Sequence, residues 1–248
     1  MEAYVKSYRE INIGIVEFGN PAGNSLPSNL LKAFKSELIA LERDSKVRVI
    51  VIKSYGNRSF CGGASLAEMK TLQTLEEATA FFMGIADLIN TLRKLTKFVI
   101  GRIQGKVVGG GIGLVAACDY VIACSQAEIK LSELSLGIGP YVIEPVVSRK
   151  IGTTAFNQLS LDAHQWKTAE WSESKGLYNV VYEELEELDK AVHSNAKRLA
   201  NYPQKAVETL RKLHWKETDQ WETLLSKNAV ITATLALEDA TQNILKNL

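Results

Sequence analysis

Two glycine-rich segments follow apolar, strand-like runs and leave backbone N–H groups uncovered by side chains. One is the triple glycine Gly109–Gly111 after Phe98–Val108, and the other is Cys61–Ser65 after Val47–Ile52. Glycine loses more backbone entropy on folding than any other residue, so three in succession before a predicted helix indicate a backbone requirement. The N–H groups at a helix N-terminus carry partial positive charge and favour an anion. Together the two turns are therefore candidates for clamping one oxygen atom.

The N–H groups of Ala64 and Gly110 are the expected pair of donors. A carbonyl oxygen held between them would be polarised. If that carbonyl belonged to a thioester, the α-carbon proton would become more acidic, because the negative charge of the enolate could move onto the held oxygen. One such donor is commonly worth about 3 kcal/mol in the transition state. Glycine at position 110 would also leave room for the substrate to approach. The alternative is that both turns are only tight connections, since glycine spacings of this kind recur by accident.

Glu133 is the candidate proton carrier. It lies within Ile129–Gly137, a mostly apolar segment, and has a leucine near it on each side. A carboxylate that is partly desolvated has a raised pKa, which suits general acid–base catalysis. A surface glutamate or a helix cap is the alternative interpretation.

The hydrophobic pattern predicts an α/β core over residues 1–190 and a helical region over residues 191–248. Apolar runs and alternation predict the strands Ile11–Ile15, Val47–Ile52, Phe98–Ile103, Lys106–Val108 and Tyr120–Cys124. Apolar residues at helical spacing and turn signals predict the helices Ser28–Asp44, Ile112–Cys118, Leu185–Leu199, Gln204–Leu213 and Trp221–Asn247, the last long enough to break. Thr74 and Glu77 have the spacing of a capping box that begins a further helix.

Composition narrows the classes of partner. The chain has 248 residues, 46% of them hydrophobic, and a net charge of +1, so no basic excess indicates nucleic acid. Its three cysteines have no paired spacing, which predicts reduced thiols and no zinc site or disulfide framework. We expect no membrane partner and a cytoplasmic location, because no segment has the length of a signal peptide's apolar stretch or of a membrane span.

The sequence indicates no catalytic or ligand-binding role for its histidines and tryptophans. His164, His193 and His214 have no partner at ligand spacing, and we expect them to be solvated or at the edge of the core. The four tryptophans fall in the helical part, where packing of helices or of a subunit interface is expected: Trp166, Trp171, Trp215 and Trp221.

Three motifs resemble those of one known family. Phe60–Leu66 is similar to the F-x-x-G-A-D-L signature of the enoyl-CoA hydratase/isomerase (crotonase) superfamily. Ile103–Gly111 followed by Cys118-Asp119 resembles the second signature of that family, and Glu133 with Gly137 and Pro140 resembles the third. The motifs occur in the same order as in the family and extend the resemblance over nearly the whole chain.

The resemblance implies an α/β fold, a crotonase-like spiral of ββα units with a C-terminal helical trimerisation region, assembled as a homotrimer or a dimer of trimers. It implies acyl-CoA thioesters as substrates, with coenzyme A as part of the substrate and no metal or redox cofactor. By position, Ala64 and Gly110 would supply the N–H groups of the oxyanion hole and Glu133 would be the acid/base. The implied contacts with coenzyme A and the acyl group are Ser25, Leu26, Gly62, Ala64, Gly109, Gly110 and Tyr141.

Two departures from the family pattern bear on the reaction. Gly113 stands where hydratases of the family carry a second glutamate, which puts water addition by two carboxylates in doubt. Tyr141–Glu144 replaces a run of small residues, so bulky side chains should reshape the acyl pocket. Glu144 is a candidate substitute for the missing carboxylate, with a surface or capping role as its alternative.

The sequence therefore predicts a 2-enoyl-CoA hydratase, or a closely related hydratase/isomerase, in fatty-acid or branched-chain acyl-CoA metabolism. Double-bond isomerisation with Glu133 as the single base is the nearest alternative. A catalytically silent oligomer that binds acyl-CoA is a third reading of the same residues.

Overall fold

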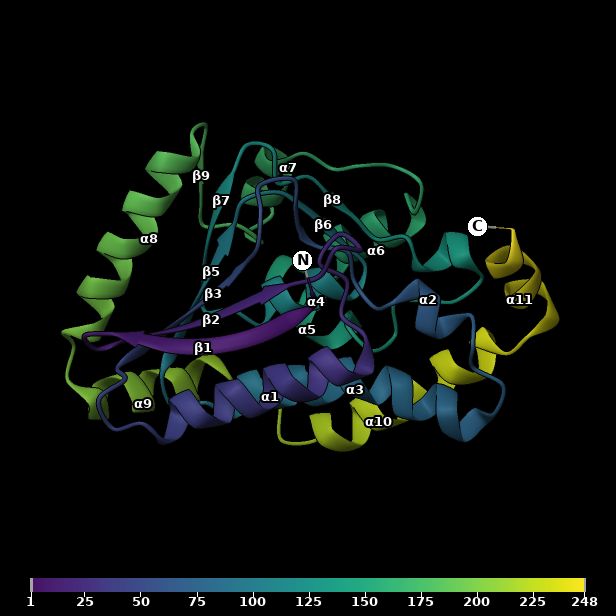
Figure 1. Cartoon of the computed structure of the whole chain (residues 1–248), viewed down its shortest axis with the longest axis horizontal. Coiled ribbons are helices and arrows are strands. Elements are labelled where there is room, and N and C mark those ends of the chain that lie inside the picture. The colour runs from purple at the N-terminus through teal and green to yellow at the C-terminus, as the bar shows by residue number, and fades with distance from the viewer. Residues whose placement is uncertain (1, 248) are drawn as a thin grey trace.

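The computed structural model describes residues 2–247 and is built around two β-sheets (Figure 1). Met1 and Leu248, the outer ends of the two predicted regions, lie outside the described residues. The larger sheet has the strand order β1-β2-β3-β5-β7-β9, with β1 antiparallel to β2 and the other neighbours parallel. The smaller sheet, β4-β6-β8, is parallel throughout.

The elements alternate between short strands and helices until the last third of the chain, which is mainly helical. The strands are β1 (Tyr4–Glu10), β2 (Ile13–Gly19), β3 (Val49–Ser54), β4 (Ser59–Cys61), β5 (Phe98–Ile103), β6 (Lys106–Val108), β7 (Tyr120–Cys124), β8 (Ile129–Lys130) and β9 (Val180–Tyr182). The helices are α1 (Ser28–Arg43), α2 (Leu66–Met69), α3 (Leu75–Lys94), α4 (Gly110–Ala116), α5 (Glu144–Ile151), α6 (Thr153–Leu161), α7 (Ala169–Ser174), α8 (Leu185–Ala200), α9 (Gln204–His214), α10 (Trp221–Ala236) and α11 (Asp239–Lys246). A single 3₁₀ turn, Glu133–Leu136, follows β8 in the described chain.

Alternating side chains of the large sheet enter two separate cores. On β2, Val16 and Phe18 belong to the larger core, where α1, α3, α4 and α10 pack. Ile13 and Ile15 face the other way and meet α8, whose Leu188 is fully buried. Figure 1 shows α1, α3 and α10 along the lower edge of the view and α8 at the left. The large sheet is thus packed on both faces.

Most predicted elements are confirmed, including the helix from Ser28, the strand Tyr120–Cys124 and the Thr74–Glu77 capping box. The strand predicted at Ile11–Ile15 was wrong at its start. Ile11 has φ 57° and is 82% exposed, because it lies in the turn between β1 and β2. The pattern missed β1, whose polar residues suit a strand that pairs on one side only.

The C-terminal part also differs in detail from the sequence expectation. The boundary expected near residue 190 falls inside α8, which continues unbroken to Ala200 and packs on the sheet. The long final helix does break, into α10 and α11. Nowhere in residues 2–247 is there a helix with both the length and the apolar character needed to span a bilayer.

Candidate active site

The first wall of the candidate site is the turn between β6 and α4. Gly109 has φ 52° and ψ −125°, a backbone conformation that residues with a side chain rarely adopt. Gly110 is then the first residue of α4, so its N–H has no acceptor within the helix. This N–H is therefore available to a ligand.

The second wall is the turn Gly62–Ala64 that follows β4. It is held from behind by Leu26, whose N–H donates to the Gly63 carbonyl oxygen at 2.8 Å. A Cβ atom built on Gly63 would lie 3.4 Å from the Gly110 nitrogen, and one built on Gly110 would lie 3.9 Å from the Ala64 nitrogen. The two turns are thus in direct contact, and the Ala64 and Gly110 amides are brought together as predicted.

Glu133 begins the 3₁₀ turn after β8, and its carboxyl group lies against the first wall. A Cβ atom built on Gly109 would come within 2.9 Å of Glu133 Oε1. A side chain at position 109 would therefore occupy the space in which the Glu133 carboxyl group lies. The Oε2 atom is buried and has no hydrogen-bond partner in the described structure. Burial raises the pKa of Glu133 to about 7, although its own backbone N–H partly offsets this effect. A carboxyl with this pKa exchanges protons readily near neutral pH.

The three groups share one cavity of about 440 Å³ that is lined by Ala64, Gly110 and Glu133 together with Gly62 and Gly109. Most of the remaining wall is apolar, with side chains from α3 and from the segment after Glu133: Phe82, Ile85, Leu136, Ile138, Val142 and Ile143. An apolar wall excludes water and strengthens the electrostatic effect of the two amides.

The other predicted contact residues do not line this cavity. Ser25 and Leu26 are buried behind the Gly62–Ala64 turn, where they support it. Tyr141 is 39% exposed, and its carbonyl oxygen accepts a hydrogen bond from Asn228. Glu144 starts α5 and is absent from the lining, so the geometry does not support it as the second carboxylate.

The place of a second carboxylate is filled by another residue. A Cβ atom built on Gly113 would lie only 2.5 Å from Ile143 Cγ2 and 3.5 Å from Ile89 Cδ1. Ile143, which lines the cavity and is buried, therefore occupies the space that a side chain at position 113 would need. The absence of a second carboxylate on α4 is built into the packing of the site.

This packing predicts the effect of Gly113→Ala. Alanine has the higher helix propensity, but overpacking against Ile143 should lower the free energy of unfolding by about 1–3 kcal/mol. Adding Ile143→Ala should recover part of that loss. Urea unfolding of both variants and of Gly110→Ala, whose Cβ would meet its nearest neighbour at 3.6 Å, measures the effect. Equal stability of Gly113→Ala and the wild type would contradict the packing argument.

Six polar lining residues were not predicted as site residues: Lys130, Ser132, Ser135, His164, Trp166 and Thr232. The expectation that His164 and Trp166 have only solvated or packing roles was incomplete, because both lie at the cavity. For Lys130 the sequence held a usable signal. It stands between the buried Ile129 and Leu131, and alternation along a strand directs its side chain away from the core that those two residues enter.

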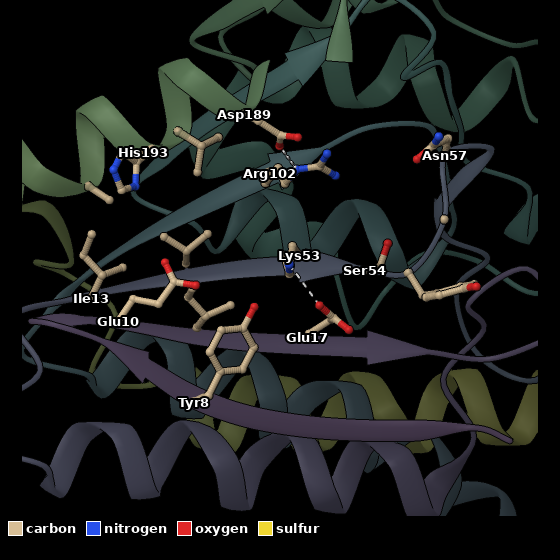
Figure 2. Close-up of a pocket in the computed structure, with 16 residues that line it drawn as sticks. Tyr8, Glu10, Ile13, Glu17, Lys53, Ser54, Asn57, Arg102, Asp189 and His193 are labelled. Atoms are coloured by element: carbon tan, nitrogen blue, oxygen red, sulfur yellow. Dashed lines mark hydrogen bonds and ion pairs between the residues drawn. The ribbon is translucent and has the colours of Figure 1, made fainter. Parts of the chain in front are cut away.

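A second hollow lies on the α8 side of the large sheet, and Figure 2 shows two of its acidic groups paired, Glu17 with Lys53 and Asp189 with Arg102. Glu17 lies 2.9 Å from Lys53 and 3.1 Å from Lys6, and Tyr4 donates to it at 2.6 Å. Burial opposes ionisation, but these hydrogen bonds dominate and hold the pKa of Glu17 at about 2. Such a carboxylate stays charged at neutral pH and is a poor proton carrier, so the Glu133 cavity is the candidate active site.

Comparison of sequences gives matches to one group of enzymes. The family model described as enoyl-CoA hydratase/isomerase matches residues 9–243. The mitochondrial methylglutaconyl-CoA hydratase of Rattus norvegicus is 39% identical over 142 residues, covering 56% of this chain and 45% of that protein. The match thus spans less than half the length of that relative. The short-chain-enoyl-CoA hydratase of Clostridium acetobutylicum is 32% identical over 197 residues, covering 79% of this chain and 75% of that protein.

Comparison of structures tests the predicted architecture. The crystal structure of enoyl-CoA hydratase from Bacillus halodurans superposes with a TM-score of 0.92 at 19% sequence identity, covering 99% of this chain and 100% of that one. A likeness of this extent confirms the crotonase-like α/β fold that the sequence motifs implied.

Proposed function

Because this chain belongs to the enoyl-CoA hydratase/isomerase family, we propose that it is an acyl-CoA enzyme whose main reaction is the hydration of a 2-enoyl-CoA. The observation that carries the proposal is the convergence of the Ala64 and Gly110 amides and the Glu133 carboxyl on one largely apolar cavity. The hydratase names of the two relatives support it. Fatty-acid or branched-chain acyl-CoA metabolism is the proposed setting.

In the proposed reaction, the thioester oxygen lies between the two amides, and the α-carbon lies beside Glu133. The ionised carboxylate takes a proton from water while the water oxygen bonds to the β-carbon. The electrons of the double bond move onto the thioester oxygen, where the two N–H groups stabilise the enolate. Glu133 then returns its proton to the α-carbon. One molecule of water is added overall, and the carboxylate is regenerated.

Double-bond isomerisation is the second candidate, and the packing of Ile143 on Gly113 favours it. A single carboxylate can remove the α-proton of a 3-enoyl-CoA, form a dienolate whose charge lies on the thioester oxygen, and return the proton to the γ-carbon. This sequence of steps needs no water and no second acid. It would use the same two amides and the same base as hydration.

The test is turnover of crotonyl-CoA and of a 3-enoyl-CoA, with products separated by liquid chromatography and identified by mass spectrometry. A 3-hydroxyacyl-CoA product supports hydration, and a 2-enoyl-CoA product that is not hydrated supports isomerisation. Binding of CoA thioesters without turnover of either substrate would instead favour the catalytically silent acyl-CoA-binding oligomer. Glu144→Gln serves as the control, because Glu144 lies outside the cavity lining.

The pH dependence of kcat/KM should report the pKa of Glu133. Both candidate reactions start from the ionised carboxylate, so kcat/KM should rise with pH up to about 7 and then level off. The rise should be about tenfold per pH unit on the acidic limb. A pH–rate profile in constant-ionic-strength buffers measures it. An acidic limb centred near the ordinary pKa of 4.5 would show that the buried carboxyl is not the base.

The same proposal covers binding and assembly. Gly62, Ala64, Gly109 and Gly110 would contact the pantetheine end of coenzyme A, and Ser25 and Leu26 would support the Gly62–Ala64 turn from behind. The two amides supply the polarisation, so the proposed reaction requires no metal or redox cofactor.

Exposed apolar residues on α9 to α11 would be covered in a homotrimer or dimer of trimers, which sedimentation equilibrium can measure: Leu213, Ile231 and Ile244. Three buried, unpaired cysteine thiols suit a cytoplasmic location.

A further inference from the structure

Among the described residues that line the active-site cavity, Lys130 is the only lysine or arginine. His164 and Trp166 also line the cavity, while most of the remaining wall is apolar. Lys130 ends β8, and its backbone is tied to the catalytic turn because its carbonyl oxygen accepts the Gly109 N–H at 3.0 Å. Gly109 in turn contacts the Glu133 carboxyl. Lys130 and Glu133 are thus both in contact with Gly109, Lys130 through its backbone carbonyl and Glu133 through its carboxyl group.

The ammonium group of Lys130 lacks a counter-ion. Its Nζ lies 4.8 Å from the centre of the Trp166 ring, and Lys106 Nζ lies 4.4 Å from the same ring. Lys106 has a partner in Glu128 at 3.3 Å. No ion pair within 4.0 Å joins Lys130 to a carboxylate in residues 2–247. A half-buried charge of this kind is stabilised by an anion that enters the cavity.

Glu133 is not that anion. A carboxylate paired with an ammonium group has a lowered pKa, whereas burial holds the pKa of Glu133 at about 7, with no neighbouring charge contributing. The two groups therefore act separately in one cavity. Glu133 would act on the reacting carbon, and the ammonium group of Lys130 is available to bind another part of the ligand.

We propose that Lys130 binds a carboxylate at the far end of the acyl chain, so that the preferred substrate is the CoA thioester of a short dicarboxylic 2-enoic acid. This inference rests on the proposed function, because it names the substrate class of that site. Trp166 contacts the ammonium group, and His164, which lines the same cavity, provides a second hydrogen-bonding group. An acyl chain with a methyl end would leave the ammonium group unpaired.

The experiment compares glutaconyl-CoA with crotonyl-CoA, which share coenzyme A and the reacting double bond and differ at the acyl end. The wild type should have the higher kcat/KM for glutaconyl-CoA. Lys130→Met should lower the ratio of the two kcat/KM values by about 10- to 100-fold, as expected for a hydrogen bond to a charged group. Lys130→Arg should retain most of the preference. Lys106→Met is the matched control, because Lys106 contacts the same ring but is absent from the cavity lining.

Two results would overturn the proposal. Equal losses on both substrates in Lys130→Met would show that Lys130 binds a group common to them, such as the diphosphate of coenzyme A. Unchanged kcat/KM values on both substrates would show that Lys130 does not bind the carboxylate of glutaconyl-CoA. If the wild type turns over neither substrate, the proposed function fails. Calorimetric titration with glutaryl-CoA and butyryl-CoA then decides the carboxylate site, since a preference for glutaryl-CoA that Lys130→Met abolishes supports it and equal binding contradicts it.

Discussion

Replacing Glu133 with glutamine should lower kcat by about 10²- to 10⁴-fold, the usual contribution of a positioned acid–base group. Glutamine keeps the size of the side chain, so the contact with Gly109 and the two amides should be preserved. The loss should therefore appear in kcat more than in the affinity for CoA thioesters. Steady-state kinetics together with calorimetric titration separates the two quantities. Activity of Glu133→Gln close to that of the wild type would remove Glu133 as the acid/base.

The same variant has a stability readout with a defined sign. The pKa of Glu133 is raised from 4.5 to about 7 in the folded protein, so folding favours the protonated form. That contribution is complete below pH 4.5 and is lost as the pH rises to about 7. Relative to Glu133→Gln, the wild type should lose up to about 3 kcal/mol of unfolding free energy across this range. Parallel pH dependence of unfolding in both proteins would contradict the burial of this carboxyl.

The second large effect is expected from Gly110→Pro, which removes one of the two amide donors. Proline suits the first position of a helix, where the lost N–H has no intrahelical acceptor, so α4 should still form. Loss of one oxyanion donor typically lowers kcat by about 10²- to 10³-fold.

Gly110→Ala is the matched control for this variant, because it retains the N–H and its Cβ would meet Ile85 only at an ordinary 3.6 Å. The ratio of kcat between the alanine and proline variants therefore isolates the N–H donor from the added bulk. We expect a ratio of about 10²- to 10³-fold, measured with both proteins folded by circular dichroism. Similar kcat values in the two variants would mean that the Gly110 amide does not stabilise the enolate.

Helices and strands that have a local sequence pattern could be predicted from the sequence. Helix α1 has apolar residues at helical spacing, and Thr74 with Glu77 begins α3 as a capping box. Strands β4 and β8 were missed, because two or three residues give no periodicity and their pairing with β6 is determined by tertiary contacts. The turn at Ile11 was missed for a related reason, since its exposure interrupts an otherwise regular alternation.

The parts of the candidate site that act through backbone groups could be predicted from the sequence. Glycine at 109 and 110 follows from a left-handed backbone and an uncovered amide, and both features can be inferred from residue type alone. The packing of Ile143 into the space beside Gly113 depends on two segments that are far apart in sequence. The pairing of Glu128 with Lys106, which leaves Lys130 without a carboxylate partner in residues 2–247, is a similar case, because only the folded structure shows which charges lie within reach. Side-chain environments of this kind arise from the fold and leave no local pattern.

Exchange of the α-proton tests the central claim most directly, because it requires enolate formation and nothing further. Butyryl-CoA, a saturated thioester, is incubated with the protein in D₂O, and deuterium at the α-carbon is followed by mass spectrometry. The wild type should incorporate deuterium, while Glu133→Gln and Gly110→Pro should do so at least about 10²-fold more slowly. Binding of butyryl-CoA by the wild type without any exchange, or equal exchange in all three proteins, would contradict an enolate held by two amides and formed by Glu133.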